Sequence, residues 1–206
     1  GLAVVEYLRG DLESAEEKYS RAISGFRLLQ NRQALSRNYF NLGDVNRLQG
    51  RFDLAIDHLE RSVEVRSEIG DLAGVIASCY YLAETHAMMG DWAAASEATQ
   101  KGLGISKKID HQQFIQEGTI REQLNVLSLD EPIAEELLQS LRPDSSGRVE
   151  NRILWYVLYC RNFQLSGSLS FSPNIQQEIV QIVPQLFKLP TTHMLCLLTA
   201  SVAPLI

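Results

Sequence analysis

Residues 48–55 read Leu48-Gln49-Gly50-Arg51-Phe52-Asp53-Leu54-Ala55, and a segment of the same kind occurs 40 positions before and 40 positions after it. The earlier copy is Leu8-Arg9-Gly10-Asp11-Leu12-Glu13-Ser14-Ala15, and the later copy is Met88-Met89-Gly90-Asp91-Trp92-Ala93-Ala94-Ala95. Each copy has an apolar residue, a Gly, a large apolar residue two positions on, and an Ala three positions further. An internal repeat of this length indicates a stack of similar supersecondary units.

The shared residues occupy the positions expected in a helical hairpin. Gly10, Gly50 and Gly90 are expected to end a helix, because glycine enters the left-handed conformation without a steric cost. The large residue that follows begins a second helix, and the apolar residues recur at steps of three and four, which is one face of a helix. A single hairpin cannot bury its apolar face alone, so neighbouring hairpins must stack. The sequence therefore predicts an all-α solenoid.

The pattern resembles the tetratricopeptide repeat, and the second unit matches it in Tyr39, Leu42, Gly43, Gly50, Phe52, Ala55, Leu59 and Val63. The third unit departs from the pattern at Cys79, Ala83 and Thr99. The 40-residue spacing is similar to the long repeats of kinesin light chains, of polarity adaptors and of sensor arms in bacterial signalling ATPases. The resemblance implies a right-handed superhelical solenoid of antiparallel helix pairs.

The repeat pattern divides the chain into three expected regions. Residues 1–128 carry the repeats, and residues 112–127 are expected to form the first helix of a fourth unit. The first unit lacks most of its first helix. We therefore expect the chain to be a piece of a longer protein. Residues 129–147 carry a degenerate repeat helix, beginning at Pro132 and ending near Leu141, and a linker. Residues 148–206 are strongly apolar, with helices expected at 149–165, 175–187 and 191–206.

Two interpretations of the region 148–206 stay open. After Ile153 its formal charges are only Arg161, Glu178 and Lys188. Such a region is either a helical cap whose apolar faces pack on one another, or an apolar interface to a second copy or to another part of the protein. The second interpretation leads to the hypothesis that this region mediates a homo-oligomer.

Composition narrows the classes of partner. The net charge of −6 and the lack of a basic block argue against nucleic-acid binding, because neutralising phosphates requires a basic face. No apolar stretch reaches about 20 residues, so membrane insertion is not expected. Cys79, Cys160 and Cys196 lie far apart without a CxxC pair, which favours reduced thiols in a cytoplasmic protein, with the cysteines as small buried residues.

The sequence lacks the common catalytic motifs, which argues against an enzyme. The chain lacks a phosphate-binding GxxxxGK[ST] loop, an HExxH motif and a GxSxG motif. His58, His86, His111 and His193 are dispersed, and one His–Cys pair near His193 is too little for zinc. We therefore expect no cofactor, no metal and no catalytic residues.

The resemblance implies that first helices line a concave groove where peptide ligands bind. Asn41 is the leading candidate, because its amide can both donate to and accept from a peptide backbone. Arginines can pair with carboxylates, and tyrosines offer a large contact area. The open alternative is a solvated groove with intramolecular Arg–Asp pairs. The aligned candidates are Arg37, Phe40, Asn41, Asp44, Arg47, Tyr80, Tyr81, Glu84 and Arg121.

The leading functional hypothesis is a protein–protein interaction module that binds a peptide or protein segment in this groove. A second hypothesis is a regulatory sensor arm of a larger bacterial signalling or transcription protein. Such an arm would bind a small effector or the protein's own effector domain. The incomplete first repeat and the apolar region 148–206 motivate the second hypothesis.

Overall fold

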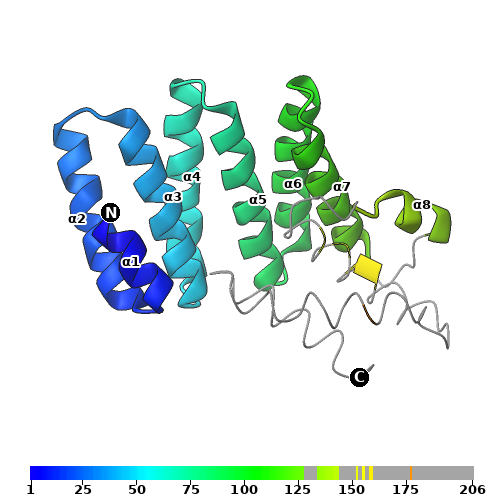
Figure 1. Cartoon of the computed structure of the whole chain (residues 1–206), viewed down its shortest axis with the longest axis horizontal. Helices are drawn as coiled ribbons and strands as arrows, with labels where there is room; N and C mark the ends of the chain where they lie inside the picture. Colours follow the sequence, from blue (N-terminus) through cyan, green and yellow to red (C-terminus); the bar gives the residue numbers. More distant parts are fainter. Residues whose placement is uncertain (128–133, 144–151, 153–154, 156–157, 160–176, 178–206) are drawn as a thin grey trace. The chain divides into compact units, whose positions relative to one another are not determined.

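The structure is a computed structural model that describes residues 1–127, 134–143, 152, 155, 158, 159 and 177. Regular structure in these residues is α-helical (Figure 1). The chain forms two compact units, residues 1–111 and residues 112–206, and each is described by itself. The helices are α1 (Leu2–Arg9), α2 (Leu12–Leu28), α3 (Arg32–Leu48), α4 (Phe52–Glu68), α5 (Leu72–Met88), α6 (Trp92–Lys108), α7 (Gln112–Leu127) and α8 (Glu135–Ser140).

The turns of the first unit have the chemistry that the repeat predicts. Gly10, Gly50 and Gly90 follow α1, α3 and α5, with φ angles of 80°, 73° and 79°. This left-handed conformation confirms the predicted helix ends. Asp11 and Asp91 cap the following helices, since each side chain accepts a hydrogen bond from the backbone N–H three residues on.

The first unit consists of three hairpins that pack one after another. The hairpins are α1–α2, α3–α4 and α5–α6, and α2 packs on α3 as α4 packs on α5. Ala15, Ala55 and Ala95, the small residues of the three repeats, have no exposed surface. The fold is therefore the predicted all-α arrangement of stacked helix pairs, which Figure 1 shows from the blue α1 to the green α6.

The repeats are held together by apolar contacts that run across the hairpins. One cluster joins residues of α2, α3 and α4, among them Tyr19, Leu35 and Val65. A second cluster joins α4 and α5 and includes Leu59 and Cys79. Cys79 has no exposed surface, as the sequence predicts.

The second unit is described only in part. Its first helix is α7, and the predicted extent of the repeats to residue 128 stays a prediction. The predicted helix from Pro132 to Leu141 corresponds to α8, while Pro132 itself lies outside the described residues. The indole of Trp155 donates a hydrogen bond to the Leu138 carbonyl at 2.8 Å. The predicted helices at 149–165, 175–187 and 191–206 lie outside the described residues, except for isolated helical positions.

The closest helix approach leads to the first prediction. A Cβ on Gly43 of α3 would lie 2.7 Å from Leu59 Cγ and 3.2 Å from the Ala55 carbonyl of α4. Leu59 is fully buried and cannot move aside. We expect Gly43→Ala to lower the free energy of unfolding by about 1–3 kcal/mol in urea denaturation, because it overpacks the contact.

Gly25→Ala is the matched control for this substitution. Gly25 lies at an exposed position of α2, and a Cβ there would meet nothing within 4 Å. The control should raise the free energy of unfolding by up to about 1 kcal/mol through helix propensity. Equal effects of the two variants would contradict the described α3–α4 contact.

Candidate protein-binding face

A fully buried guanidinium lies at the junction of α3 and α5. Arg47 of α3 has no exposed surface, and its Nη2 lies 2.6 Å from Asp44 Oδ1, one turn earlier on the same helix. Its Nη1 donates to Glu84 Oε1 of α5 at 2.7 Å. Burial alone would lower the pKa of Arg47, but the Glu84 and Asp44 carboxylates outweigh it, so its pKa is raised. Arg47 is therefore held as a permanent cation.

The same cluster extends to α1. The hydroxyl of Tyr7 donates a hydrogen bond to Asp44 Oδ2 at 2.6 Å. Burial raises the pKa of Tyr7, and the Asp44 carboxylate raises it further, so the phenol stays protonated as the donor. We call Tyr7, Asp44, Arg47 and Glu84 the ionic network. It ties the first helices of three successive repeats to one another.

Aromatic rings continue from the ionic network towards α4. The Arg47 guanidinium carbon lies 5.2 Å from the centre of the Tyr81 ring, and the Tyr81 and Phe40 rings are 4.6 Å apart at 59°. The guanidinium carbon of Arg66, from α4, lies 4.9 Å from the Phe40 ring centre. The two rings thus lie between the two cations in one line, and the negative face of each ring stabilises the guanidinium next to it.

Arg66 closes this line at the start of α5. Its Nη1 donates to the Gly74 carbonyl at 2.5 Å and to Ser78 Oγ at 3.3 Å. Its Nε is buried without a hydrogen-bond partner. Burial lowers the pKa of Arg66, the nearby Asp71 opposes this, and Arg37 lowers it further. The Asp71 carboxylate, 3.8 Å from Arg66 Nε, therefore offsets the effect of burial only in part.

The structure brings most of the predicted groove residues together on the first-helix face, the surface that α1, α3 and α5 form around the ionic network. They differ in depth: Arg37 is exposed, Phe40, Asn41 and Tyr81 are half-buried, and Asp44, Arg47 and Glu84 are buried.

Two predicted residues are not brought to this face. Tyr80 is 1% exposed, and its hydroxyl lies 3.3 Å from Ser106 Oγ of α6, so it packs inside the third hairpin. Arg121 belongs to the second unit, where its Nη2 lies 3.1 Å from Glu117 Oε1. Neighbouring helical positions point about 100° apart. On α5 the Tyr80 side chain points to α6, whereas the Tyr81 ring packs on Phe40 of α3.

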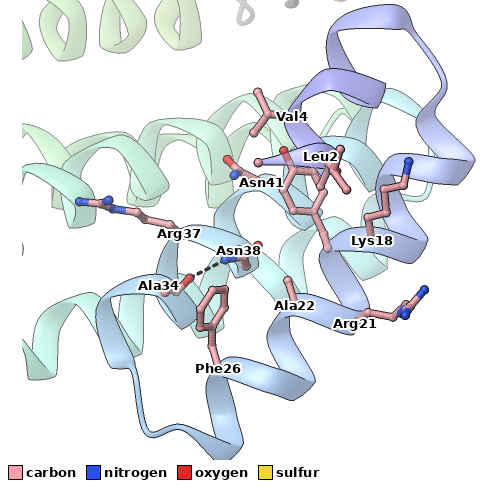
Figure 2. A pocket seen from close by; sticks show the side chains of 13 residues that line it. Leu2, Val4, Lys18, Arg21, Ala22, Phe26, Ala34, Arg37, Asn38 and Asn41 are labelled. Atoms are coloured by element: carbon pink, nitrogen blue, oxygen red, sulfur yellow. Dashed lines mark hydrogen bonds between the residues drawn. The ribbon is translucent and has the colours of Figure 1, made fainter.

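A cavity of about 730 Å³ opens where α1, α2 and α3 meet (Figure 2). Asn38 is tied to the Ala34 carbonyl at 2.7 Å, on the wall that α3 provides. On the same wall, and within the described residues, the Asn41 amide has no hydrogen-bond partner and Arg37 has no ion pair. The lining of the cavity includes Leu2 and Val4 of α1, Lys18 and Phe26 of α2, and Arg37 and Asn41 of α3.

Sequence reasoning missed the contribution of the second helices. Lys18 and Phe26 of α2 line the cavity, and Arg66 of α4 reaches the Phe40 ring. The family resemblance points only to first helices. The 40-residue spacing of the repeats could have pointed to these residues. Phe26, Arg66 and Ser106 occupy equivalent positions in the three units, and the first two have large side chains where the third has a small one.

Other kinds of site find no support in the described part of the chain. No group of three His, Cys, Asp or Glu side chains there could hold a metal ion. No described helix is both long and apolar enough to cross a membrane.

The ionic network leads to the second prediction. We expect Arg47→Met to lower the free energy of unfolding by about 3–5 kcal/mol, because it leaves Asp44 and Glu84 buried without a cation. Urea denaturation measures the change. Arg61→Ala is the control, since it breaks an Arg–Asp pair on α4 whose side chains are about half exposed, and it should cost less than about 1 kcal/mol. A small effect of Arg47→Met would contradict the network.

A comparison with protein-family models agrees with this architecture. A comparison with curated proteins found no match. The family model described as Tetratricopeptide repeat matches residues 1–68 and again residues 34–108, which together span the three hairpins. Repeats of this family are non-catalytic scaffolds that generally mediate protein–protein interaction. The chain belongs to the tetratricopeptide repeat family.

Proposed function

We propose that the chain is a protein–protein interaction module that binds a peptide segment of its partner along the first-helix face. The observation that carries this proposal is a pair of accessible polar groups on the wall that α3 contributes to the cavity. Within the described residues, the Asn41 amide and the Arg37 guanidinium have neither a hydrogen bond nor an ion pair. An amide can pair with a peptide backbone, and a guanidinium can pair with a carboxylate.

The buried and the accessible residues of the first-helix face have different roles in binding. Asp44, Arg47 and Glu84 satisfy one another inside the fold, so their part is to hold α3 and α5 in position. Arg37, Asn41 and the half-buried rings of Phe40 and Tyr81 make the contacts with the partner. A face held rigid before binding reduces the entropy lost on association. Aromatic and arginine side chains are also the usual anchors of such interfaces.

Cys79, one of the chain's three cysteines, is a free and fully buried thiol. Burial raises the pKa of Cys79, which keeps the thiol neutral and unreactive. Together with the scattered cysteines of the sequence, this supports our proposal of a cytoplasmic location.

The third prediction tests the binding face. Peptides selected from a random library against the chain should lose at least about tenfold in affinity when Arg37→Ala and Asn41→Ala are combined, which corresponds to about 1.4 kcal/mol. Fluorescence anisotropy measures the dissociation constants. Thermal unfolding should change little, because Arg37 is exposed and Asn41 is half-buried.

The control combines Arg61→Ala with Gln100→Ala, which removes the same kinds of group from exposed positions of α4 and α6. It should leave the affinity unchanged. If both double variants bound the selected peptides as tightly as the unchanged chain, the binding face would be wrongly assigned.

A further inference from the structure

Two arginines, one from α2 and one from α4, contact the same buried tyrosine of α3. Tyr39 is 6% exposed, and its hydroxyl accepts a hydrogen bond from Arg27 Nη2, in the last turn of α2, at 2.6 Å. The guanidinium carbon of Arg61, from α4, lies 6.0 Å from the centre of the Tyr39 ring. We call Arg27, Tyr39 and Arg61 the arginine–tyrosine cluster. All three residues belong to the first unit.

The cluster has more hydrogen-bond donors than acceptors. Within the described residues, the Tyr39 hydroxyl accepts from Arg27 but donates to no group. Arg61 donates its Nε–H to Asp57 Oδ1 at 3.1 Å. A guanidinium has five N–H donors, so most of those of Arg61 remain for other acceptors. An acceptor-rich group therefore suits this place.

The next repeat shows that helix packing alone does not require the cluster. Forty positions on, the residues equivalent to Arg27, Tyr39 and Arg61 are Ser67, Cys79 and Lys101. Cys79 is fully buried in an apolar cluster, so a small thiol can occupy the position of the tyrosine. A buried hydroxyl needs one hydrogen-bond partner, which Arg27 already provides. The second cation is therefore not needed to satisfy the hydroxyl, and it places two like charges beside one phenol.

Both arginines are accessible from solvent and stay charged at neutral pH. Arg27 is exposed, and the side chain of Arg61 is 47% exposed. Contact with Tyr39, followed by the pair with Asp57, raises the pKa of Arg61. His58 stacks on the Tyr39 ring at 6.2 Å, and burial lowers its pKa, so it is neutral at pH 7. An anion that arrives from solvent thus meets two permanent cations and a hydroxyl.

We propose that the arginine–tyrosine cluster binds a phosphate monoester on a side chain of a partner protein, at a site separate from the first-helix face. Its donors come from three helices, and a phosphate monoester offers three terminal oxygens around one centre. A carboxylate offers only two oxygens in one plane. Arginine is the side chain that pairs best with phosphate, through forked hydrogen bonds. The phosphate charge also offsets the repulsion between the two guanidinium groups.

The fourth prediction uses phosphoserine that is blocked at both ends, so that the phosphate is its only charge. Titration of the chain, followed by the NMR signals of the arginine side chains, should show saturable binding with a dissociation constant in the millimolar range or tighter. Blocked serine and blocked glutamate should bind at least about tenfold more weakly, because they lack the phosphate. Higher salt should weaken the binding of phosphoserine.

Substitutions test whether the cluster is the site. Arg27→Ala combined with Arg61→Ala should weaken phosphoserine binding at least about tenfold. Tyr39→Phe keeps the ring and removes the donor, and it should weaken binding at least about threefold. Lys101→Ala combined with Lys107→Ala is the control, since it removes two exposed cations at the equivalent positions of α6 and changes the net charge equally. It should leave the dissociation constant unchanged, and the NMR spectrum checks that each variant is folded.

Three outcomes would overturn the phosphate site. Blocked glutamate that binds as tightly as phosphoserine removes phosphate as the ligand. Unchanged binding to the double arginine variant removes the cluster as the site, and an equal loss in the double lysine variant shows unspecific attraction. The library-selected peptides carry no phosphate, so their affinity does not depend on Arg61, and failure of the phosphate site leaves the first-helix face standing.

Discussion

The burial of the Arg47 guanidinium is the constraint on which the first unit depends. Removing a cation from water costs several kcal/mol, so the fold must supply carboxylates at fixed positions. Asp44 comes from the same helix and Glu84 from the next repeat, at 2.6 Å and 2.7 Å. Tyr7 then satisfies the second oxygen of Asp44 from the preceding repeat. If one helix slipped along another, a buried charge would lose its partner. The network therefore specifies the register in which the repeats stack.

This register has a consequence for binding. Apolar contacts among the hairpins tolerate small shifts, whereas directional hydrogen bonds to a buried cation do not. Because α3 is held from both sides, Asn41 and Arg37 keep a fixed relation to the cavity wall, one or two turns before Asp44 on that helix. The buried polar residues thereby prepare a surface that they do not themselves form, and the exposed residues act on a rigid support.

The sequence predicts the repeat architecture well, but it predicts poorly how deeply each side chain is buried. Glycines with left-handed φ and fully buried alanines recur as their spacing indicates, because turns and close helix contacts have strict local requirements. The alignment to the repeat pattern also assigns Asp44 and Arg47 to the first-helix face, where their side chains pair with one another. It cannot show that Tyr81 of the next repeat covers Arg47 from 5.2 Å, which converts a predicted ligand contact into an internal one. Phe26 and Lys18 were missed because their role depends on three helices meeting.

The most direct measurement is a double-mutant cycle between Tyr7→Phe and Glu84→Gln, two residues that Asp44 and Arg47 join to one another. Urea denaturation of the unchanged chain, both single variants and the double variant provides the coupling free energy. If the network works as one unit, the two effects should depart from additivity by more than about 0.5 kcal/mol. Additive effects would show that α1 and α5 are stabilised independently, and the account of Arg47 as the link between the repeats would be wrong.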